Sequence, residues 1–109
     1  MNKEIEKYLI DKFPEARSGF IKTIVSALDI HANKNHDYNS KDSIQKYNAI
    51  ETLAKFLDIR RKYSRIENII MNELQYKVNE TLEDSAIDLG VYSFLFAEYI
   101  YNHKQQKYD

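Results

Sequence analysis

The stretch AIDLGVYSFLFA, residues 86–97, contains only two polar residues, Asp88 and Ser93. A helix of this composition is apolar on nearly every side, which predicts a position at the centre of a packed bundle. A serine can return its hydroxyl to the helix backbone, whereas a carboxylate has no such local partner. Because an isolated buried carboxylate is costly, we expect a cation or a metal ion opposite Asp88.

The rest of the chain predicts further helices and few turns. Its 109 residues include two glycines and one proline, too few turn formers for a β-sandwich or barrel. Apolar residues at helical spacing predict helices over about residues 3–13, 14–35, 41–56, 58–75 and 79–102. The pattern leaves open whether the third and fourth form one bent helix.

The length suits one domain, so we expect a single all-α domain over residues 1–109, a four- to five-helix bundle. Residues 1–13 would form its N-terminal helix and residues 104–109 a frayed tail. The predicted buried faces of the second and fourth helices consist of apolar residues three or four apart. They are Phe20, Ile21, Ile24, Val25 and Leu28, and then Ile59, Tyr63, Ile66, Ile70 and Leu74.

Composition excludes several classes of protein. The net charge of −1 gives no global field to attract nucleic acid or an anionic membrane, so neither is an expected partner. The chain has no cysteine and therefore no disulfide. The first thirteen residues are charged throughout, unlike a signal peptide, and the longest mostly apolar run, 89–97, is too short to span a bilayer. We expect a soluble cytoplasmic protein.

Three acidic residues precede or enter the apolar stretch at helical spacing. Glu80, Asp84 and Asp88 lie four residues apart, so their side chains face broadly the same way on a helix. A row of carboxylates repels itself unless a divalent cation or basic side chains neutralise it. An alternative stays open for Glu80, Glu83 and Asp84, because acids in a first helical turn also complement the helix dipole.

Basic residues cluster in the fourth predicted helix. Lys62 and Arg65 flank its apolar stripe and can reach toward the interior, where they would pair with the acidic row or bind phosphate oxygens. A solvated basic face is the alternative for Arg60 and Arg61. A DNA-contacting helix is a third interpretation, which the nearly neutral chain does not favour.

A polar loop follows the second predicted helix. It contains Lys34, Asp37 and Tyr38, residue types that often bind ligands, although loops are usually polar for solubility alone.

Taken in order, three segments resemble the nucleotide-modification-associated domain family of phage and bacterial proteins. Residues 34–39 match its K-x-x-D-Y-G/N loop, residues 62–66 its K-x-x-R-L/I helix, and residues 80–92 its E-S/T-x-x-D-S/T-x-x-D-L-A/G-x-Y helix. The third motif is the most specific, because acids and an aromatic residue recur at fixed offsets. The resemblance covers about residues 28–99. That family is distantly similar to the all-α, MazG-like nucleoside triphosphate pyrophosphohydrolases.

The resemblance implies a function and roles for these residues. Glu80, Asp84 and Asp88 would be the catalytic acids that hold Mg²⁺, and Lys62 and Arg65 would bind phosphate. Lys34, Asp37 and Tyr38 would border the nucleotide pocket. The products would be a nucleoside monophosphate and pyrophosphate, and a homo-oligomer is implied by the same resemblance. Two features depart from the enzymes: residues 48–74 hold no second E-x-x-E pair, and Arg61 stands where an aspartate is expected.

A function of another class fits the same residues. In a non-catalytic helical module that binds a host or phage protein, the carboxylates would pair with Lys62 and Arg65 as a structural network. The two hypotheses differ in whether the acids meet other acids or basic side chains.

Overall fold

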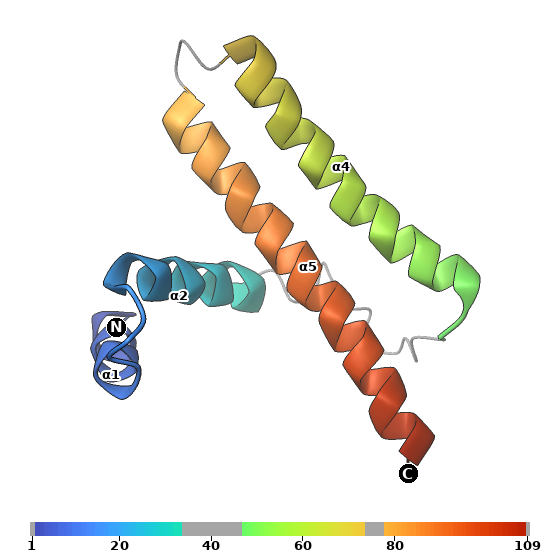
Figure 1. Ribbon diagram of the computed structural model, residues 1–109, viewed down its shortest axis with the longest axis horizontal. Helices are drawn as coiled ribbons and strands as arrows, with labels where there is room; N and C mark the ends of the chain where they lie inside the picture. Colours follow the sequence, from blue (N-terminus) through green and yellow to red (C-terminus); the bar gives the residue numbers. More distant parts are fainter. Residues whose placement is uncertain (1, 34–46, 74–77, 109) are drawn as a thin grey trace. The chain divides into compact units, whose positions relative to one another are not determined.

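The computed structural model describes residues 2–33, 47–73 and 78–108, and every regular element among them is an α-helix (Figure 1). The helices are α1 (Asn2–Lys12), α2 (Ser18–Asn33), α4 (Ala49–Glu73) and α5 (Val78–Tyr108). The all-α class is therefore confirmed. The chain divides into two compact units, Met1–Asp42 with α1 and α2 and Ser43–Asp109 with α4 and α5. The single domain stays a prediction.

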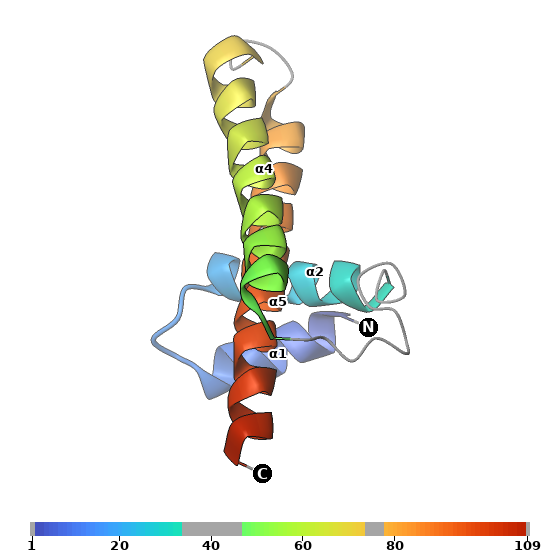
Figure 2. The ribbon, with the colours of Figure 1, turned by 90° about the vertical axis from the view of Figure 1, so that its right-hand side faces the viewer.

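In the first unit, α1 and α2 run antiparallel across a short turn (Figure 2). Pro14 disfavours a helical Phe13, which agrees with the end of α1 at Lys12. The second helix begins at Ser18 and not at Pro14 as predicted, because the Ala16 N–H bonds back to the Phe13 carbonyl at 3.1 Å and completes a turn.

The core of this first unit is narrow. Ile21 and Val25 are buried as predicted, at 5% and 3% exposure. Phe20 and Leu28 were also expected in the core, but they are 60% and 57% exposed. In a unit of two helices, α1 covers only one side of α2, so a wider apolar stripe is left uncovered.

The second unit is an antiparallel hairpin in which α4 packs along α5 (Figures 1 and 2). α4 is continuous from Ala49 through the expected boundary near residue 57, so the two helices predicted there are one. Asp58 does not break it, because its carboxylate pairs with Arg61 one turn later at 3.3 Å.

Residue Asn48 caps the beginning of α4. Its side-chain Oδ1 accepts the Glu51 N–H at 2.8 Å, the usual contact of an N-cap asparagine. Residues 47 and 48 are not helical, so the prediction of a helix over residues 41–56 was wrong at these two residues. Residues 41–46 lie outside the described part.

The fifth helix is longer than predicted, since it continues past Asn102 to Tyr108. The His103 ring stacks on Tyr47 at a centroid distance of 3.6 Å, a contact that supports the helix beyond the predicted end. Val91 and Tyr99 are buried. Phe94 is 71% exposed, which corrects the expectation of a fully covered central helix, because α5 meets a single helix within its unit.

The residues of α4 that face α5 recur every three or four positions and include both charged and apolar side chains. Ile69 is buried, whereas Ile59 and Ile66 are half-buried. Tyr63 and Ile70, expected on the buried face, are 59% and 42% exposed, since the contact with α5 is centred to one side of them. Leu74 lies outside the described residues.

Candidate functional site

The carboxylate of Asp88 meets a lysine across the α4–α5 contact. Lys62 Nζ donates to Asp88 Oδ2 at 3.4 Å. A positive group was expected opposite Asp88, and Lys62 supplies it. The burial was overestimated: the Asp88 side chain is 37% exposed and that of Lys62 is 21% exposed. With one neighbouring helix in the unit, the edge of the contact stays open to water.

An aromatic ring completes the surroundings of the lysine. Lys62 Nζ lies 5.2 Å from the centroid of the Tyr92 ring, within the range of a cation–π interaction. Asp88 and Tyr92 are four residues apart on α5, so one helix face presents both an anion and a ring to the same ammonium group. The lysine is thereby held in one place on the hairpin.

A second cation lies one turn further along α4. Arg65 Nε donates to the hydroxyl of Ser85 at 3.4 Å, and Ser85 is 4% exposed. Going from Lys62 to Arg65 advances three residues on α4, and going from Asp88 to Ser85 steps back three on α5. This antiparallel register brings both basic residues onto the predicted acidic helix. We refer to Lys62, Arg65, Ser85, Asp88 and Tyr92 as the polar cluster.

The predicted acidic row is only partly placed by the structure. Asp84 is exposed and lies one turn before Asp88. The side chain of Glu80 lies outside the described residues, as do Lys34, Asp37 and Tyr38. Among the side chains that are described, no three acids or histidines lie close enough together to hold a metal ion by themselves. Of the three acids in the predicted row, the structure therefore describes the side chains of Asp84 and Asp88.

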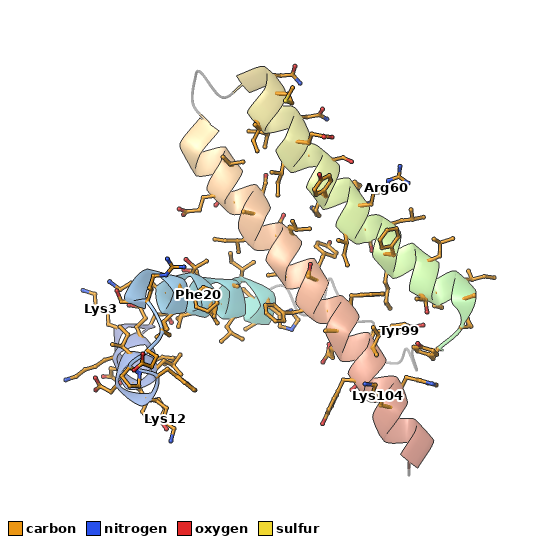
Figure 3. All side chains as sticks on the ribbon, in the orientation of Figure 1. Lys3, Lys12, Phe20, Arg60, Tyr99 and Lys104 are labelled. Carbon is orange, nitrogen blue, oxygen red and sulfur yellow. The ribbon has the colours of Figure 1, made fainter. Side chains whose placement is uncertain are left out.

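The motif over residues 80–92 contains Ser85 and Tyr92, but sequence reasoning gave these two members of the polar cluster no role in the site. Each lies three or four residues from Asp88 and so shares its helix face, which is the signal that identifies them. Sequence reasoning also missed Tyr99, whose hydroxyl accepts the Asn48 N–H at 3.3 Å and lies 3.2 Å from Thr52 Oγ1. Figure 3 shows Tyr99 on the side of α5 that faces the beginning of α4.

Comparison with protein-family models, with curated proteins and with solved structures gives no match to this chain. Over the described residues, no helix is both long enough and apolar enough to cross a lipid bilayer.

Proposed function

We propose that the polar cluster binds the phosphates of a nucleoside triphosphate together with Mg²⁺, and that the protein releases pyrophosphate from it. The supporting observation is that Lys62 and Arg65 of one helix reach Asp88 and Ser85 of the next. Cations and acids beside one another on an open edge suit a ligand that carries both negative charge and a divalent cation. Nucleotide chemistry is what the resemblance of residues 80–92 to the nucleotide-modification-associated domain family implies.

The two cations have the donor capacity that this role needs. An ammonium group carries three hydrogens, so Lys62 can keep Asp88 and still donate to a phosphate oxygen. Arg65 bonds Ser85 through Nε, and a guanidinium has further N–H groups for a second oxygen. Both cations would offset the negative charge of the departing pyrophosphate.

The acids fit Mg²⁺ in its usual substrate-bound form. The ion commonly takes one or two carboxylates and completes its shell with water and substrate phosphate, so Asp84 and Asp88, one turn apart, are a sufficient protein share. When bound, Mg²⁺ supplies charge neutralisation and a more acidic water. The overall reaction adds water oxygen to the α-phosphorus and breaks the α–β anhydride, giving monophosphate, pyrophosphate and one proton.

The test uses Asp84, because this acid is exposed, whereas Asp88 already pairs with Lys62. Purified protein is given a panel of nucleoside triphosphates with Mg²⁺, and both pyrophosphate and the thermal shift are measured. We expect D84N to lose turnover by about 100-fold or more with an unchanged free energy of unfolding. The matched control is E83Q, an exposed neighbour that points to another side of α5.

The absence of both turnover and a thermal shift with every nucleotide would defeat the proposal. So would D84N and E83Q proteins that behave alike while the wild type is active.

A second candidate function is a non-catalytic helical module that binds a bacterial or phage protein. The specific observation in its favour is that Lys62 already pairs with Asp88, as a structural network would have it. It predicts that D88N lowers the free energy of unfolding, that Mg²⁺ and nucleotides change nothing, and that D84N is silent. In both candidates the site of action is the cytoplasm.

A further inference from the structure

The ammonium group of Lys62 lies where it opposes a metal ion at Asp88. Its Nζ is 3.4 Å from Asp88 Oδ2, in the carboxylate that the proposed function assigns to Mg²⁺. The side chain of Lys62 is only 21% exposed, so water and salt screen its charge less than that of a fully solvated lysine. Even at the dielectric constant of water, a unit charge about 5 Å from a divalent cation weakens the binding of that cation roughly tenfold. Free Mg²⁺ is therefore opposed at this acid.

The hairpin holds Lys62 beside this acid. Its Nζ lies 5.2 Å from the centroid of the Tyr92 ring, so moving away would give up a cation–π contact as well as the ion pair. Lys55 has the same relation to Tyr99, with its Nζ 5.0 Å from the ring centroid. The two lysines are seven residues apart on α4 and the two tyrosines seven apart on α5, so the antiparallel register places each lysine over a ring. Lys55 is about 10 Å from Lys62 along the helix, which makes it a matched control.

The charges of the polar cluster and of Asp84 cancel one another. Lys62 and Arg65 carry two positive charges, and Asp84 and Asp88 carry two negative ones. Free Mg²⁺ is attracted by the acids and repelled by the basic side chains, and a metal-free triphosphate meets the reverse. A triphosphate with Mg²⁺ bound offers the ion to the acids and phosphate oxygens to the basic side chains, so each charge gains an opposite neighbour. The four side chains are thus matched to the complex and not to either part alone.

We propose that Lys62 is a specificity-determining residue, which makes the site bind Mg²⁺ together with a triphosphate in preference to the free ion. The lysine occupies the place of a metal ion beside Asp88 until phosphate oxygens accept its hydrogens and neutralise its charge. This inference rests on the proposed nucleotide function and deepens it, because it predicts that the ion and the nucleotide bind cooperatively. Each raises the affinity for the other by the same factor, as thermodynamic linkage requires.

The experiment compares K62M with the wild type and with K55M in two titrations of the full chain, each followed by amide NMR. Free Mg²⁺ is the first titrant, and a panel of non-hydrolysable nucleoside triphosphates with Mg²⁺ is the second. We expect K62M to bind the free ion at least about tenfold more tightly than the wild type, and the Mg²⁺–nucleotide complex at least about tenfold more weakly. K55M removes the same charge from the same face of α4, and it should leave both affinities within about twofold of the wild type.

Opposite effects on the two affinities cannot come from a damaged fold, which would weaken both, and circular dichroism checks each variant. Equal affinity of K62M and the wild type for free Mg²⁺ would overturn the proposal, and binding of the Mg²⁺–nucleotide complex by both would then leave the nucleotide function standing. The same gain in K55M would also overturn it, since total charge and not the position beside Asp88 would then set the affinity. A wild type that binds no such complex would overturn this proposal and the nucleotide function together.

Discussion

Removing the hydroxyl of Tyr99 should weaken the α4–α5 hairpin measurably. Thr52 Oγ1 donates its one hydrogen to the Asn48 carbonyl at 2.8 Å, so Tyr99 must be the donor in its 3.2 Å contact with Thr52. The same hydroxyl accepts the Asn48 N–H at 3.3 Å. Tyr99→Phe therefore deletes two hydrogen bonds from a side chain that is 3% exposed.

Each such bond contributes about 0.5–1.5 kcal/mol net. Both are long and water can reach Asn48, so we expect a loss of roughly 1–2 kcal/mol in the free energy of unfolding, read from urea melts by circular dichroism. Tyr101→Phe is the matched control, because Tyr101 is 58% exposed, and it should change stability by less than about 0.5 kcal/mol. Equal effects of the two substitutions would refute the bonding pattern.

Three further predictions concern the same hairpin. Asn48→Ala should lower the free energy of unfolding by about 0.5–2 kcal/mol, because Oδ1 accepts the Glu51 N–H and caps α4. The control is Asn68→Ala, since Asn68 is exposed in the middle of α4, and urea melts should show no such loss for it. Gly90→Ala should raise the free energy of unfolding by about 0.5–1 kcal/mol, since a methyl group there meets no heavy atom within 4 Å outside its own helical turn; a lower melting temperature would count against this. A double-mutant cycle of Lys62→Met and Asp88→Asn should give a coupling of about 0.5–1 kcal/mol, small because Asp88 is more than a third exposed; a coupling of zero would mean that the pair does not form in solution.

The helices were predictable because their signals are local. Few turn formers and apolar residues at helical spacing specify an all-α chain, and Ile21 and Val25 were identified as core in this way. The boundaries depend on contacts distant in sequence. α5 passes Asn102 with His103 stacked on Tyr47, a partner 56 residues earlier that no periodicity can reveal.

The candidate site was predictable in composition and not in geometry. Spacing placed Asp84 and Asp88 on one side of a helix, and the cost of burying a carboxylate called for a cation. Which cation it would be depends on the register between α4 and α5, and that register pairs Lys62 with Asp88 and Arg65 with Ser85. The exposure of Asp88 also escaped sequence reasoning, because the apolar residues around it do not show how many helices cover them.

The most direct test of the nucleotide proposal is a titration of the ¹⁵N-labelled protein with Mg²⁺ and a non-hydrolysable nucleoside triphosphate, followed by amide NMR. We predict saturable shifts concentrated at Lys62, Arg65, Asp84 and Asp88, which D84N abolishes while E83Q keeps them. Shifts that are absent, or that centre on residues remote from the polar cluster, would contradict the account.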